Sequence, residues 1–120
     1  MKSLLFIFLA LQTLIGGTAQ FDKTVHDFGT ISEKDGAQRC VFTVTNKGDK
    51  PLTILSVVPS CGCTGVEWTR GSIAAGEQGT IRVVYKNEDG PYPFDKSVTV
   101  YLSDIKKPVI LHLRGVVAKK

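Results

Sequence analysis

The residues best suited to chemistry are Cys61 and Cys63, which are separated by a single glycine, Gly62. The chain has one further cysteine, Cys40. Because glycine can adopt positive φ angles, the backbone at Gly62 can turn the two neighbouring sulfurs toward each other. The spacing permits three outcomes: a tight disulfide, a two-thiolate metal site, or a packed turn without chemistry. The sequence alone does not choose among them.

A disulfide stabilises a protein chiefly by restricting the unfolded chain, and the gain rises with the length of the closed loop. A bridge from Cys40 to Cys61 or Cys63 should contribute about 3.4 kcal/mol, whereas a Cys61–Cys63 bridge should contribute about 1.6 kcal/mol before strain. The short bridge would be a weak staple and a reducible bond. Cys40 lies on the inward face of a predicted strand, where a lone cysteine usually acts as a small apolar residue. All three pairings stay open.

As metal ligands, Cys61 and Cys63 offer two soft thiolates, which suit copper(I) or half of a tetrahedral zinc site. Zinc would need two more ligands, and the only histidines, His26 and His112, have no paired spacing. Thiol redox or copper(I) chemistry is therefore the functional alternative to a structural turn. No phosphate-binding glycine loop or supported catalytic triad is present, so we do not expect an enzyme.

The chain begins with the pattern of a secretory signal peptide. Lys2 precedes an apolar block over residues 4–15, and the small residues Gly17 and Ala19 follow it. The block is shorter than the roughly 20 apolar residues of a membrane-spanning helix. We predict a signal peptide at residues 1–19 with cleavage after Ala19. Since no cysteine follows that position, we do not expect a lipid anchor.

The remaining residues, 20–120, fit one domain. They carry 14 basic and 11 acidic side chains, with the two signs scattered along the chain. Such a surface favours solubility and does not predict nucleic-acid binding. We expect no transmembrane segment after the signal peptide is removed.

Short runs of alternating apolar and polar residues, separated by Gly, Pro and Asn turns, predict strands and no helices. The predicted strands are residues 21–28, 37–46, 52–58, 80–86, 94–102 and 109–117. Residues 66–69 form a short and ambiguous element that would be a seventh strand. Their predicted inward residues are Cys40, Phe42, Val44, Val83, Val98, Val100, Leu102, Val109, Leu111 and Leu113. Residues 52–58 are apolar on both faces and are predicted to be central and buried. The fold class is all-β, an immunoglobulin-like antiparallel β-sandwich of about seven strands, with the cysteine turn at its rim.

Several stretches of the chain together resemble a bacterial family. They are residues 21–31, residues 42–48 with Pro51-Leu52, Ser60-Cys61-Gly62-Cys63-Thr64, residues 73–76 and residues 113–116. The chain resembles the domain of unknown function numbered fifteen seventy-three, a relative of major sperm protein and cilium-associated immunoglobulin-like domains. The resemblance implies a seven-stranded sandwich in the Gram-negative envelope and no established activity. The family's cysteine pair carries over onto Cys61 and Cys63, and its usual proline before Gly76 is replaced by Ala75, which should loosen that turn.

Two functional hypotheses follow. The first is an exported, non-enzymatic binding or structural module of the periplasm or cell envelope, which contacts an unidentified protein partner through sheet edges and loops. The second is a thiol redox or copper(I)-binding protein that uses Cys61 and Cys63.

Overall fold

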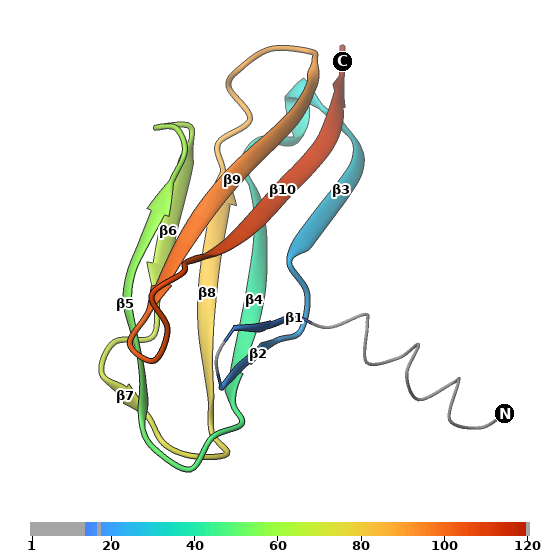
Figure 1. Cartoon of the computed structure of the whole chain (residues 1–120). Coiled ribbons are helices and arrows are strands. Elements are labelled where there is room, and N and C mark those ends of the chain that lie inside the picture. The colour runs from blue at the N-terminus through green and yellow to red at the C-terminus, as the bar shows by residue number, and fades with distance from the viewer. Residues whose placement is uncertain (1–13, 17, 120) are drawn as a thin grey trace, which may run out of the picture.

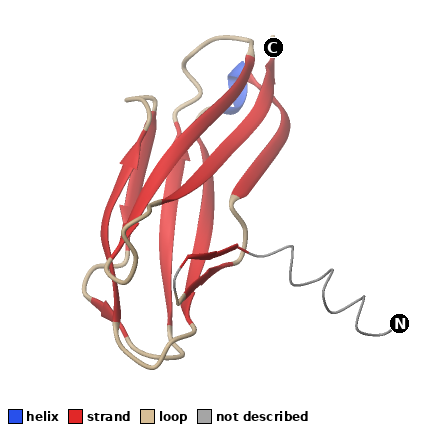
Figure 2. Ribbon diagram, in the orientation of Figure 1, coloured by secondary structure: helices blue, strands red, loops and turns tan. Residues whose placement is uncertain are grey.

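Alternating apolar and polar residues form strands whose apolar faces pack together as two sheets (Figure 1). The computed structural model describes residues 14–16 and 18–119. Its strands are β1 (Leu14–Gly16), β2 (Ala19–Phe21), β3 (Val25–Ser32), β4 (Gln38–Asn46), β5 (Leu52–Pro59), β6 (Thr64–Trp68), β7 (Ser72–Ile73), β8 (Gln78–Tyr85), β9 (Pro93–Leu102) and β10 (Val109–Ala118). A 3₁₀ helix covers Glu33–Asp35 (Figure 2). The predicted all-β sandwich is confirmed.

One sheet has the strand order β1-β2-β4-β8-β6, and the other has the order β3-β10-β9-β5-β7. The inward rows of both sheets meet in one core, in which Phe42, Val83, Val100 and Leu111 have no exposed surface. These residues were predicted to point inward, because every second position of their strands is apolar. Seven of the described strands have five residues or more, in agreement with the predicted number.

The predicted first strand, residues 21–28, is wrong as a single element. Phe21 ends β2 in one sheet, whereas β3 begins at Val25 in the other sheet and pairs in parallel with β10. Asp22 marks the crossing, since its carboxylate accepts a 2.9 Å hydrogen bond from the Thr43 amide and its own amide bonds to the Thr43 carbonyl. The strand also does not end at Gly29, which lies within β3 at φ 70°.

The prediction that residues 52–58 are buried on both faces is also wrong. Leu55 and Val58 are 59% and 47% exposed. An irregularity in the pairing with β9 leaves Leu55 as an extra residue beside Ser56, opposite Tyr101. Such a bulge can turn an additional side chain toward solvent. The described strands form two sheets only, so no third layer covers the outward side chains of β5.

The other predicted strands are confirmed to within two residues at each end, and β7 was not predicted. Of the predicted signal peptide, residues 1–13 and 17 lie outside the described residues. Strand β1 and Thr18 belong to the described part, where β1 pairs with β2. Within the described ranges, no helix has the length and apolar character needed to cross a membrane.

Candidate functional site

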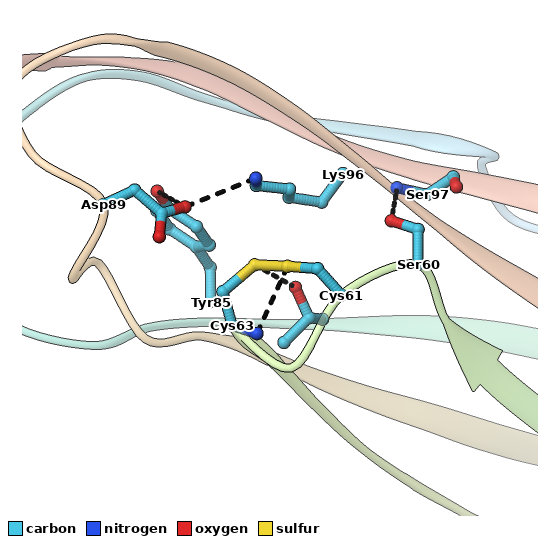
Figure 3. The surroundings of a disulfide bond; sticks show 8 residues. Ser60, Cys61, Cys63, Tyr85, Asp89, Lys96 and Ser97 are labelled. Atoms are coloured by element: carbon cyan, nitrogen blue, oxygen red, sulfur yellow. Dashed lines mark hydrogen bonds and ion pairs between the residues drawn. A yellow bond between two sulfur atoms is a disulfide. The ribbon is translucent and has the colours of Figure 1, made fainter.

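The cysteine turn connects β5 in one sheet to β6 in the other, and in the structure Cys61 and Cys63 form a disulfide (Figure 3). Their Cα atoms are 5.3 Å apart, and both residues are half-buried at one end of the sandwich. Of the three pairings that the sequence left open, this one closes the shortest loop. Cys40 remains a free, buried cysteine.

Hydrogen bonds tie this turn to both sheets. The Ser60 amide donates to the Ser97 carbonyl over 2.9 Å, and the Ser97 amide donates back to the Ser60 hydroxyl over 3.1 Å (Figure 3). On the other side, the Lys86 amide donates to the Cys63 carbonyl over 2.9 Å. The amide of Cys63 also donates to the Cys61 sulfur over 3.2 Å. These contacts fix the point at which β6 begins relative to β8.

Below the turn, Cys63 packs against a small apolar cluster that contains Tyr85 and Phe94. The two rings stack with their centroids 4.0 Å apart. The Tyr85 hydroxyl donates to the carboxylate of Asp89 over 3.2 Å, and Lys96 lies 3.3 Å from the same carboxylate (Figure 3). Burial, followed by the nearby Asp89 charge, raises the pKa of Tyr85 to about 12. This phenol therefore stays neutral at physiological pH and supports the turn by packing.

Cys40, the third cysteine, lies on the inner face of β4, opposite Val83 of β8. Burial raises the pKa of its thiol to about 11. A thiol with so high a pKa is neutral near pH 7, and it is therefore a poor nucleophile and a poor metal ligand. The structure does not bring Cys40 to the cysteine turn.

Neither histidine belongs to the turn, since His26 lies on β3 and His112 on β10. The His26 ring on β3 contacts the Lys23 ammonium group over 2.9 Å, and His112 on β10 contacts Asp95 over 2.9 Å. Among the described residues, no three His, Cys, Asp or Glu side chains are grouped closely enough to hold a metal ion. Copper(I) binding by Cys61 and Cys63 would require the reduced dithiol, since thiolates are the ligands.

The strand that leaves the turn, β6, is an edge of its sheet (Figure 1). The bonds from Lys86 to Cys63 and from Thr69 to Thr80 show that the odd-numbered residues of β6 face β8 with their backbone groups. By the alternation of an antiparallel ladder, the N–H and C=O groups of Val66 and Trp68 point away from the sheet. Across residues 18–119, neither has a hydrogen bond outside the strand ladder.

A shallow hollow of about 460 Å³ lies beside this edge on the outer face of β4, β8 and β6. Two cross-strand rows form it, one of Arg39, Val84 and Gly65 and one of Val41, Arg82 and Glu67. Gly65 contributes no side chain, so the hollow opens toward the edge. Neither arginine has an ion-pair partner in the described part of the chain.

Sequence reasoning missed both the edge and the hollow, because residues 66–69 were treated as a short and ambiguous element. The available signal was Thr64 and Val66, two β-branched residues that favour a strand on either side of Gly65. The position of this strand at the sheet edge depends on the order of strands far apart in sequence, which no local pattern contains.

A family model described as Protein of unknown function (DUF1573) matches residues 19–117, nearly the whole described chain. The chain belongs to this family. The resemblance inferred from the residues is thereby confirmed. A comparison of this DUF1573 chain with curated proteins found no match.

Solved structures of the same fold include a protein of unknown function from Porphyromonas gingivalis, with a TM-score of 0.70 and 15% identity over 85% of this chain and 49% of that one. This chain thus spans about half of that protein's length. The PapD-like domain 7 of human CEP192 has a TM-score of 0.66 and 10% identity over 87% of each chain. WR4, a major sperm protein family member from C. elegans, has a TM-score of 0.58 and 12% identity over 86% of this chain and 100% of that one.

At such low sequence identity, these structural likenesses establish the fold alone. That fold confirms the predicted immunoglobulin-like class. The PapD-like and major sperm protein neighbours share the β-sandwich fold with this member of the DUF1573 family.

Proposed function

We propose that this DUF1573 protein is an exported, non-enzymatic module that binds a protein partner along the open edge of β6. The observation that carries the proposal is the outward direction of the backbone N–H and C=O groups of Val66 and Trp68. An exposed strand edge of this kind can accept an extended segment of another protein as an additional strand, through main-chain hydrogen bonds.

The cysteine turn supports this role by holding the start of the edge strand. The disulfide limits the conformations of the three residues before Thr64, and the bond from Lys86 to Cys63 sets the register of β6 on β8. A partner strand therefore meets an edge that is already ordered, and pre-organisation reduces the entropy cost of binding.

The export part of the proposal rests on the leader-like sequence of residues 1–19. A half-exposed disulfide is also compatible with an oxidising compartment such as the periplasm, whereas cytosolic reductants would open it. We place the protein in the periplasm or cell envelope on these two grounds.

The test is site-specific photo-cross-linking in cells that export the chain. A photoreactive residue replaces Glu67 on β6, and the matched control replaces Glu77, an equally acidic and exposed residue in the β7–β8 connection. We expect a protein adduct from position 67 that is lost when Val66→Pro is added, because proline removes the outward N–H without touching a bond to β8. Equal adducts from both positions, or none from position 67, would contradict the proposal.

The second candidate function is thiol redox or copper(I) chemistry at Cys61 and Cys63, and the half-exposed disulfide between residues two apart favours it. Reduction by a dithiol, counted by alkylation and mass spectrometry, and competition with a copper(I) chelator test it directly. Turnover of thiol substrates that disappears in Cys61→Ser would establish this candidate over the first. A bridge inert to dithiols and no copper uptake by the reduced form would remove it.

A further inference from the structure

We propose that the segment bound at β6 carries a carboxylate side chain opposite Gly65 and a basic side chain two residues away, opposite Glu67. This inference rests on the proposed edge binding and names the chemistry of the partner. It is carried by the hollow beside the edge, by its two arginines and by the single carboxylate at its rim.

Gly65 leaves room for the partner's side chain. A Cβ atom added at Gly65 would meet no atom within 4 Å, so the space above this residue is open. The residues behind it, Val84 and Val41, have apolar side chains on the same outer face, and Val41 is 42% exposed. A side chain that crosses Gly65 from an added strand can therefore lay its methylene groups on an apolar floor.

Two guanidinium groups flank this floor. Arg39 of β4 lies opposite Val84 and Arg82 of β8 lies opposite Val41, so the arginines occupy diagonal corners of the β4–β8 pair. An added strand would lie about 10 Å from β8, which is two strand spacings, and about 14 Å from β4, which is three. A glutamate and the extended Arg82 can together bridge the shorter separation, and Arg39 adds positive charge at the far end of the Gly65 row. Arginine binds carboxylates through paired N–H donors, and neither arginine has an ion-pair partner among residues 18–119.

Glu67 determines the second position. It lies two residues from Gly65 on the same outer face of β6, and it is exposed. A like charge directly opposite it on an added strand is unfavourable, whereas an opposite charge is favourable. The edge therefore selects an acidic and a basic side chain at alternate positions and disfavours the reverse order, which fixes the register of the partner strand.

The experiment uses the chain as purified after export and a display library of random 12-residue peptides as the probe. One enriched peptide is then synthesised with a fluorescent label and titrated by anisotropy. We expect enriched sequences to share an acidic and a basic residue at spacing i and i+2, flanked by β-branched residues that favour an extended strand. The Val66→Pro variant should lose this binding, because it lacks an outward N–H.

Three variants test the hollow itself. Gly65→Val fills the open space above residue 65, so it should weaken peptide binding about tenfold or more. Because valine favours strands more than glycine does, the melting temperature should not fall. The double variant Arg39→Gln and Arg82→Gln should weaken binding by a similar factor. Glu67→Lys should restore binding to a peptide whose basic residue is exchanged for an acidic one. Arg114→Gln, an exposed arginine on the outer face of the other sheet, is the matched control and should leave binding unchanged.

The outcomes separate the two proposals. Suppose that a peptide fails to bind the Val66→Pro variant but binds the Gly65→Val variant and the double arginine variant as tightly as it binds the wild-type chain. That result would overturn this inference and leave edge binding standing. Peptides that bind the Val66→Pro variant normally would overturn both. Enrichment of no peptide, together with self-association that Val66→Pro abolishes, would assign the edge to a second copy of the chain and overturn the carboxylate partner.

Discussion

The carbonyl oxygen of Cys63 accepts a 2.9 Å hydrogen bond from the backbone amide of Lys86. This bond joins the cysteine turn to β8 and sets which residues of β6 face the sheet with their backbone groups. Because the pairing continues to Trp68, the turn determines that the backbone N–H and C=O groups of Val66 and Trp68 point away from β8. The disulfide and the open edge are therefore parts of one structural unit.

Loss of the disulfide should cost little stability. A bridge that closes three residues contributes about 1.6 kcal/mol through the unfolded chain. We expect the double variant Cys61→Ser and Cys63→Ser to fold, with a free energy of unfolding lower by about 1 to 2 kcal/mol in urea titrations. Wild-type protein measured with a reductant should match the variant. Unfolding of the variant at room temperature would show that the bridge holds far more of the structure than this turn.

Thiol accounting should separate Cys40 from the other two cysteines. The Cys40 side chain is buried and its pKa is raised to about 11, so native protein at pH 8 should react negligibly with a thiol reagent. Mass spectrometry after alkylation should find one modified cysteine in denatured protein and three after denaturation with a reductant. Rapid labelling of the native chain, or two unbridged thiols besides Cys40, would contradict this arrangement.

Stability should fall at alkaline pH because of Tyr85. Its pKa is about 12 in the folded chain, against about 10 when unfolded. Below pH 10 both states are protonated; above it the unfolded state loses the proton first, so the free energy of unfolding falls until about pH 12. Tyr85→Phe should show a shallower decrease in urea titrations between pH 10 and 11. The same slope in both proteins would show that Tyr85 titrates normally. Ionisation of Cys40 lowers the free energy of unfolding equally in the wild type and in Tyr85→Phe, so it does not affect the difference between their slopes.

The variant Ala75→Pro should stabilise the fold. The Glu77 amide bonds to the Ala74 carbonyl over 2.9 Å, and Gly76 has φ 81°, which makes residues 74–77 a type II turn with Ala75 at its second position. Proline fits that position and restricts the unfolded chain, for a gain of about 0.4 to 1 kcal/mol. Calorimetry should find a higher melting temperature. As the comparison, Gly76→Ala should lower it, since alanine disfavours positive φ.

Much of the fold could be predicted from the sequence because β4, β8, β9 and β10 each have at least three apolar residues at successive inward positions. The crossing at Asp22 could not, since it depends on hydrogen bonds to Thr43 on a distant strand. Nor could the exposure of Leu55, because a bulge shifts the alternation by one residue.

The cysteine pairing was left open for a related reason. Loop entropy alone favours a bridge to Cys40, but the strand register overrides it. Cys40 pairs with Val83 of β8, whereas Cys63 is hydrogen-bonded to Lys86, three residues further along the chain. Strand β8 also lies between β4 and β6, so the sulfurs of Cys40 and Cys63 are held apart. Position in the sheets, which the linear sequence does not contain, therefore decides which sulfurs meet.

Amide hydrogen exchange resolved by NMR tests the open edge of β6 most directly. In the free chain the amides of Val66 and Trp68 should exchange with solvent much faster than those of Gly65 and Glu67, because only the latter pair donates to β8. Addition of a peptide that binds the edge should selectively slow the amide exchange of Val66 and Trp68. Strong protection of Val66 and Trp68 in the free, monomeric chain would mean that the edge is already occupied, and it would contradict the proposed binding site.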